Sequence, residues 1–227
     1  MPRRSRRRLA GWLTPTSSCS RLSRSALGYQ AINAHRPLTF VPDPLAMPDF
    51  TVRLCVPDDA PRVAVVAARL FTQAYGATHP EPELSRYLAR SFTADFFACE
   101  LTDAGVRVLI VEAMDGTLLG YAQMRATTGA RPEGVEGSHP VEIVRFYIDA
   151  QFHGAGLAQA LMAACEAEAR AMGGDVLWLD VWQEAPRPQA FYRRSGFAIV
   201  GTTTFAFGDR LDADYVMARP LLPAVTS

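Results

Sequence analysis

The feature that most constrains this chain is a predicted strand that leads through two glycines directly into a predicted helix, between residues 141 and 172. Residues 141–148 are mostly β-branched or aromatic, which favours a buried strand. After Gly154 and Gly156, an apolar residue recurs every four positions, as a helix over 156–172 requires: Leu157, Leu161, Cys165 and Ala169. Glycines let a backbone approach a ligand closely, and the unpaired amides and dipole of a first helical turn attract anions. The segment therefore predicts a site for a phosphate or pyrophosphate group.

Two familiar nucleotide-binding patterns do not fit this segment. The dinucleotide fingerprint requires a third glycine where this chain has Gln159, and a Walker loop requires a lysine, which the sequence lacks entirely. A single glycine turn before a helix thus leaves the identity of the phosphate ligand open.

The rest of the chain supplies further strands and helices in a mixed order. Asp58 or Asp59 is expected to cap a first helix after Pro57, and further helices are expected over 81–92 and 189–195. A loop rich in glycine, proline and threonine is expected over 127–139, and strands are expected over 51–55, 107–113, 118–125, 176–182, 197–207 and 211–218. This order predicts an α/β fold with a mixed sheet and helices on both faces.

The N-terminal segment differs in composition from the rest. Eight arginines lie between Arg3 and Arg36, before the first acidic residue, Asp43. We expect residues 1–48 to be a disordered basic extension. It has three interpretations: an organelle transit peptide, an arm for nucleic acid or a membrane surface, or a sequence upstream of a true start at Met47. Residues 49–220 are expected to form the domain and 221–227 a short tail.

Charge and composition narrow the partners of that domain. From Asp43 onward the 23 acidic residues outnumber the arginines by eight, which favours cationic partners such as amines and argues against nucleic acid. No apolar run approaches the roughly 18–20 residues that span a bilayer, so we expect no membrane partner and a cytoplasmic location. The cysteines show no C-x-x-C spacing, so no metal site is predicted.

Three separated motifs resemble those of the GCN5-related N-acetyltransferases (GNAT family). Gln151-x-x-Gly154-x-Gly156 is similar to the family's motif A, and two downstream stretches are similar to its next motif: Leu177-x-Leu179-x-Val181 and Phe191-Tyr192-x-x-x-Gly196-Phe197. The resemblance covers about residues 51–218. It implies a mostly antiparallel sheet of six to seven strands, splayed between the fourth and fifth strands, 141–148 and 176–182.

The resemblance also implies acetyl-CoA as co-substrate, bound in that splay. Backbone groups of Phe146, Tyr147 and Ile148 would pair with the pantetheine arm, and Gln151 belongs to the motif. The pyrophosphate would lie on the amides of His153, Gly154, Ala155, Gly156, Leu157 and Ala158. An amine would attack the thioester directly, without an acyl-enzyme, and the sequence shows no recognisable nucleophile motif.

The same resemblance assigns the proton transfers. Tyr192 would protonate the departing sulfur, the alternative being a core aromatic. Glu142 would accept the proton of the amine, directly or through a water, the alternative being a strand-end carboxylate paired with Arg145 or with solvent. Asp180 and Glu112 are further candidates for that base.

Other positions bear on the acceptor and on activity. Ala185 and Pro188 stand where the family often has Asn and Ala, which removes one hydrogen bond. Trp178, Asp180 and Trp182 share one face of a strand, which would line an acceptor pocket or pack under a helix. Tyr75 would either contact the acceptor or pack against neighbouring residues of the fold without a role in the site.

The predicted function is transfer of an acetyl group from acetyl-CoA to a small-molecule or peptide amine, by a monomer or homodimer. The alternative is a catalytically silent module that binds acyl-CoA and regulates another process.

Overall fold

Seven strands form one sheet in the computed structural model, which describes residues 49–208 and 210–221. The strand order is β1-β2-β3-β4-β5-β7-β6, and every neighbouring pair is antiparallel except β4 and β5, which are parallel. The strands are β1 Phe50–Leu54, β2 Val106–Ala113, β3 Leu118–Ala126, β4 Pro140–Ile148, β5 Val176–Trp182, β6 Ala198–Phe207 and β7 Arg210–Pro220. The predicted mixed and mostly antiparallel sheet is confirmed.

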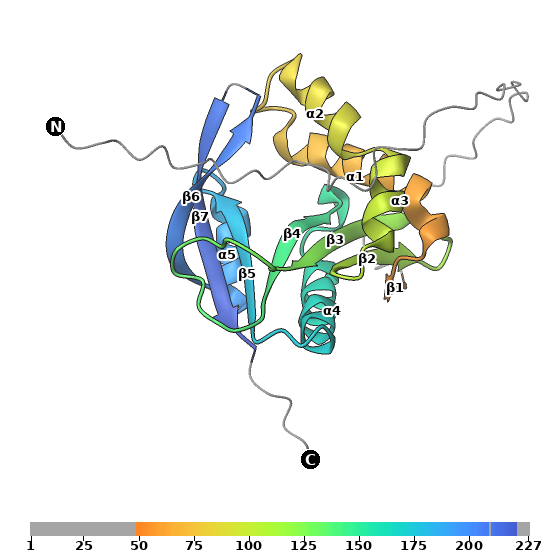
Figure 1. The fold of residues 1–227 in the computed structure, drawn as a ribbon. Helices are drawn as coiled ribbons and strands as arrows, with labels where there is room; N and C mark the ends of the chain where they lie inside the picture. Colours follow the sequence, from red (N-terminus) through yellow and green to blue (C-terminus); the bar gives the residue numbers. More distant parts are fainter. Residues whose placement is uncertain (1–48, 209, 222–227) are drawn as a thin grey trace, which may run out of the picture. The chain divides into compact units, whose positions relative to one another are not determined.

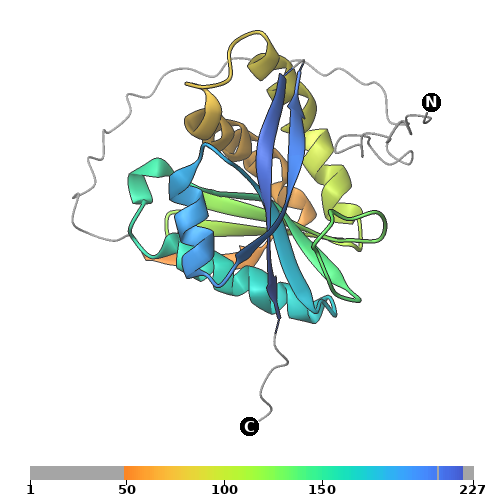
Figure 2. The same ribbon diagram turned by 90° about the vertical axis from the view of Figure 1, so that its left-hand side faces the viewer.

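Helices cover both faces of this sheet. Figures 1 and 2 show α1 (Ala60–Tyr75), α2 (Glu83–Ser91) and α3 (Ala94–Thr102) on one side and α4 (Leu157–Ala171) on the other. The remaining helix, α5 (Pro186–Arg194), packs Phe191 and Tyr192 against the apolar core that α4 also fills. Two short 3-10 turns, Pro57–Asp59 and Ala150–Phe152, precede α1 and follow β4. Helix α3 was not predicted, although Thr93 caps it by accepting from the Phe96 amide at 3.0 Å.

The predicted capping role of the aspartates before α1 is wrong. Asp59 occupies the N-cap position, but its side chain accepts no hydrogen bond from the first turn of α1. Its carboxylate instead accepts from the Val56 amide at 2.9 Å and from Arg53 Nη1 at 2.7 Å. Asp59 thus ties β1 to the start of α1, because a guanidinium competes effectively for a carboxylate.

The pairing of β4 with β5 is short. It joins only Pro140, Val141 and Glu142 to Val176, Leu177 and Trp178, whereas β5 pairs with β7 along its whole length. A bulge at Val144 also interrupts the register of β4 with β3. Beyond Glu142 the edge of β4 that faces β5 is therefore unpaired within residues 49–208 and 210–221, and its backbone groups are available to a ligand. This is the predicted splay.

The two faces of β5 divide as the sequence predicts. Leu177, Leu179 and Val181 pack into the main core with α4, while Trp178, Asp180 and Trp182 alternate on the other face. Trp178 packs with Val135 of the loop over 127–139 and donates from Nε1 to Thr127 Oγ1 at 2.9 Å. This tryptophan is therefore covered by the loop, and the alternative that at least one tryptophan of this face packs under a helix stays a prediction.

Two expectations concern segments that the structure does not describe. The proposed basic extension over 1–48 lies outside the described residues, as do residues 222–227 of the proposed tail. Among the helices of the described part, none has the length and apolarity needed to cross a membrane.

Candidate active site

The N-terminus of α4 presents a row of unpaired amides. Gly156 is its N-cap residue with φ 83°, and Gly154 has φ 91°. Both glycines are open to solvent at the position of a Cβ, so the left-handed backbone, and not crowding, selects glycine here. The first bond of α4 runs from the Ala160 amide to the Gly156 carbonyl at 3.0 Å, which leaves the preceding amides of Leu157 and Ala158 without helical partners. Amides of this kind, together with the helix dipole, are able to bind an anion. The amides of His153 and Ala155, also predicted to hold the pyrophosphate, instead donate to the carbonyl oxygens of Ala150 at 3.3 Å and Phe152 at 3.2 Å.

A buried aspartate holds the turn that precedes α4. Asp149 accepts from the Gln151 amide at 3.2 Å and from Gln73 Nε2 at 3.4 Å, and it forms an ion pair with Arg69. Burial by itself raises the pKa of Asp149, but the Arg69 and Gln151 hydrogen bonds outweigh it and lower the pKa overall. Two residues of α1 therefore fix the turn in place. The sequence signal that was missed is an Asp at the end of a strand, where it can form a local turn with the amide two residues on.

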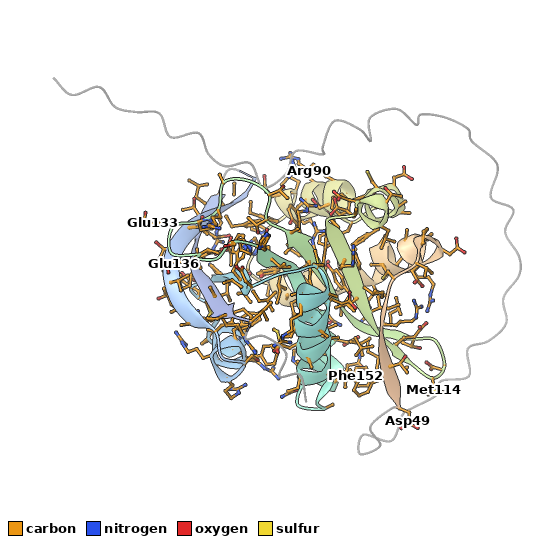
Figure 3. The ribbon with its side chains drawn as sticks, turned by 60° about the horizontal axis from the view of Figure 1, so that its bottom comes forward. Asp49, Arg90, Met114, Glu133, Glu136 and Phe152 are labelled. Atoms are coloured by element: carbon orange, nitrogen blue, oxygen red, sulfur yellow. The ribbon has the colours of Figure 1, made fainter. Side chains whose placement is uncertain are left out.

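The turn also packs against the core through its aromatic residue. Phe152 ends the turn that joins β4 to α4 in the chain and packs against the main apolar cluster; Figure 3 shows it beside the end of α4. The side chain of Gln151 is exposed, and His153 Nε2 lies 3.2 Å from the carbonyl oxygen of Ile148. The predicted cofactor residues of the turn are thus adjacent to the open edge of β4.

A cleft of about 230 Å³ follows that open edge. Its walls are residues 143–148 of β4, the C-terminal end of α1 including Tyr75, Ala150 and His153 of the turn, and Ala185 and Pro188 before and in α5. Asp180 and Tyr192 complete it. The cleft thus brings together five of the predicted site residues: Phe146, Tyr147, Ile148, His153 and Tyr192. The other predicted site residues are not among its lining residues: Glu142, Gln151, Gly154, Ala155, Gly156, Leu157 and Ala158.

Tyr192 is a buried aromatic whose side chain faces this cleft. It is 8% exposed, and its ring centroid lies 6.2 Å from that of Phe146 and 5.9 Å from that of Phe197. Burial first, and the neighbouring Tyr75 second, raise the pKa of its hydroxyl above the usual range. The hydroxyl is therefore protonated at neutral pH and able to donate a proton.

Two carboxylates lie close to the point where β4 and β5 separate. Glu142 is 7% exposed, and its Oε1 has no hydrogen-bond partner among the described residues. Burial, followed by the charge of Asp180, raises the pKa of Glu142 well above its usual range. Asp180 lines the cleft, and burial followed by the charge of Asp214 raises its pKa to about 7.

The structure does not support the alternative that Glu142 pairs with Arg145 or with solvent. Arg145 Nη1 donates to Gln123 Oε1 at 2.5 Å, and its guanidinium lies 4.8 Å from the ring centroid of Phe92. Glu112, a further candidate, lies on β2 and accepts from Arg53 and Arg62 at 2.7 Å each. Those hydrogen bonds lower the pKa of Glu112, so it is a structural carboxylate away from the cleft.

The family's usual Asn and Ala are absent, and a different residue secures α5. Pro186 occupies the first turn of the helix. Gln189 Nε2 donates to the carbonyl oxygens of Trp182 at 3.0 Å and Gln183 at 2.9 Å. These bonds join α5 to the end of β5 and so position Tyr192 three residues later.

Comparisons with known proteins agree with this geometry. Residues 68–197 match the profile of the Acetyltransferase (GNAT) family. The chain is 34% identical over 165 residues to an N-acetyltransferase of Mycobacterium tuberculosis, covering 72% of this chain and 99% of that protein. It is 31% identical over 150 residues to an aminoglycoside N(6')-acetyltransferase type 1 of Stenotrophomonas maltophilia, covering 65% and 85%.

Solved structures show the same fold. The PaiA N-acetyltransferase of Thermoplasma acidophilum, in complex with coenzyme A, superposes with a TM-score of 0.62 at 16% identity, covering 76% of this chain and 99% of that one. A GCN5-related N-acetyltransferase of Rhodopseudomonas palustris gives 0.57 at 20% identity, covering 78% and 99%. This chain therefore belongs to the GNAT acetyltransferase family and is an N-acetyltransferase.

Proposed function

We propose that this enzyme transfers the acetyl group of acetyl-CoA to an amine by direct attack in the cleft between β4 and β5. The observation that carries the proposal is a single cleft lined by the open edge of β4, Tyr192 and Asp180, with the amide-bearing turn before α4 beside it. Acetyl-CoA fits the residues present, because the pyrophosphate needs an anion site and the pantetheine amides need unpaired backbone groups. A structural neighbour is a complex with coenzyme A, which supports the same use here.

We assign the protonation of the leaving group to Tyr192. The amine nitrogen attacks the thioester carbonyl carbon, the carbon–sulfur bond breaks, and the sulfur leaves with a negative charge. Tyr192 is one of three tyrosines that line the cleft, with Tyr75 and Tyr147, and all three hydroxyls are protonated at neutral pH. We assign the proton to Tyr192 because it lies on α5 within the motif that resembles the family's, and its proton would neutralise that sulfur.

The proton of the amine requires an acceptor, and we assign it to the carboxyls Asp180 and Glu142. The charge of Asp180 contributes to the raised pKa of Glu142, whereas burial and the charge of Asp214 raise the pKa of Asp180. Asp180 is the member that lines the cleft, and a pKa of about 7 suits a general base near neutral pH. Glu142 lies behind it and would receive the proton through Asp180 or a water.

The acceptor is an amine, and the cleft favours a cationic one. Its described wall contains Asp180, and the relative from Stenotrophomonas maltophilia acts, by its name, on aminoglycosides. A panel of small amines and N-terminal peptides, assayed for thiol release from acetyl-CoA, tests this proposal. Release with at least one amine supports it, whereas tight binding of acetyl-CoA without release from any amine would favour the alternative of a silent acyl-CoA-binding module.

A further inference from the structure

A second carboxylate lies beside Asp180 on the neighbouring strand. Asp214 of β7 is directly opposite Trp182, while Asp180 is opposite Val216. Directly opposed residues point to the same face, so Asp180 and Asp214 are diagonal neighbours, at about 7–8 Å in such a sheet. Their coupling agrees with this placement, because the charge of Asp214 contributes to the raised pKa of Asp180.

Within residues 49–208 and 210–221, no ion pair neutralises either of these carboxylates. Asp214 is 8% exposed, and its Oδ1 has no hydrogen-bond partner among the described residues; Asp180 Oδ1 has none either. The contrast is Asp212, next on the same face of β7, which lies 3.1 Å from His79 Nε2 and forms an ion pair with Arg210. A buried carboxylate without a partner is costly, and a ligand cation would relieve that cost.

The surroundings of Asp214 suit an alkylammonium group. Asp214 is not among the residues that line the cleft, but two of its neighbours are: Asp180 on the adjacent strand, and Tyr75, whose raised pKa includes a contribution from the charge of Asp214. Trp182 pairs with Asp214 across the sheet and already has the Arg210 guanidinium 5.7 Å from its ring centroid. Aromatic faces attract cations and cover methylene groups, so this region favours a cation on a short apolar chain.

We propose that Asp214 binds a second ammonium group of the acceptor, so that the substrate is a small di- or polyamine. The inference rests on the proposed N-acetyl transfer in the cleft. The amine to be acetylated lies beside Asp180 and Tyr192, and the other ammonium group lies beside Asp214. A monoamine of the same length leaves Asp214 unpaired, so it binds more weakly.

The test compares two pairs of acceptors: putrescine with n-butylamine, and kanamycin with glucosamine. The first pair shares a four-carbon chain and differs by one ammonium group, whereas the second compares a large amino sugar that carries several ammonium groups with a small one that carries a single group, so the two pairs distinguish an aliphatic from a sugar acceptor. We expect kcat/KM to favour the polycation of at least one pair by about tenfold to a hundredfold, as expected for one charged hydrogen bond. Asp214→Asn should abolish this preference, measured as the ratio of kcat/KM for the polycation to kcat/KM for the monoamine, so that any effect on the base Asp180 cancels.

The control variant is Asp58→Asn, which removes the same charge from an exposed position at the opposite end of α1. It should keep the preference. Calorimetric titration of the wild-type enzyme and Asp214→Asn with putrescine and kanamycin needs no turnover. Loss of binding in Asp214→Asn supports the inference even if the wild-type enzyme acetylates none of these amines. The lack of acetylation would then contradict only the proposed reaction. Equal use and equal binding of polycation and monoamine by the wild-type enzyme, or a preference that survives Asp214→Asn, would overturn the inference.

Discussion

Replacement of Asp180 by asparagine should stabilise the ligand-free protein, and the gain should grow with pH. Burial, followed by the charge of Asp214, raises the pKa of Asp180 from 3.8 to about 7. A carboxyl whose pKa is raised on folding contributes stability below its unfolded pKa, and this contribution is lost as the pH rises through the folded pKa. Asparagine has the same shape and carries no charge at any pH, so it avoids that loss.

The size of the effect follows from the pKa difference. A shift of about three units corresponds to about 4 kcal/mol of unfolding free energy above pH 8, at 1.36 kcal/mol per unit. Near pH 5.5 the Asp180 carboxyl is ionised in the unfolded chain but protonated in the folded protein. Asp180→Asn should therefore raise the unfolding free energy by about half of the amount expected above pH 8. Near pH 4 the two proteins should be equally stable.

Urea unfolding followed by circular dichroism at pH 4, 5.5 and 8.5 measures these differences. Asp175→Asn is the control with the opposite sign. Burial raises the pKa of Asp175, but the amides of Ser138 and His139 outweigh it and lower the pKa overall, so Asp175→Asn should destabilise at neutral pH. An Asp180→Asn protein whose stability relative to wild type does not change with pH would refute the reasoning.

Three further predictions concern the proposed reaction. Tyr192→Phe should keep acetyl-CoA affinity but lower kcat by about 10²–10⁴-fold, measured by thiol release, and an unchanged kcat would remove Tyr192 from the proton transfer. Gly156→Ala forces a side chain into the left-handed region at a cost of about 1–2 kcal/mol, so acetyl-CoA affinity should fall in calorimetry; an unchanged affinity would argue against the helix terminus as the anion site. The wild-type kcat/KM should rise as pH increases through about 7, where Asp180 loses its proton, and Asp180→Asn should lack this inflection. If Asp180→Asn shows the same profile, another group is the base.

Much of the fold was predictable because its signals are local. The limits of β5 agree with the prediction from its alternating residues, and Asp115-Gly116 marks the turn between β2 and β3. Helix α3 was not predicted because it is short and its adjacent Phe96 and Phe97 do not show helical spacing. The predicted capping role of Asp59 failed because Arg53, on the preceding strand, binds the Asp59 carboxylate. A local capping pattern does not reveal that competing partner.

The site residues that belong to a sequence motif were predictable. Those that come together only through the alignment of neighbouring strands were not. Gly154 and Gly156 adopt the left-handed backbone that the glycine turn suggested, and Tyr192 lies in the wall of the cleft. The proximity of Asp180 and Asp214 depends on how β5 aligns with β7, which a single sequence does not reveal. The end of the β4–β5 pairing after Glu142 is likewise a property of the sheet as a whole.

Steady-state thiol release, with acetyl-CoA and the best amine varied independently, distinguishes direct acetyl transfer from transfer through an acyl-enzyme. Direct transfer predicts intersecting reciprocal plots, one acetylated amine for each CoA released, and no acetylated protein by intact mass when amine is withheld. Parallel plots together with an acetylated protein would show an acyl-enzyme and contradict the proposed mechanism.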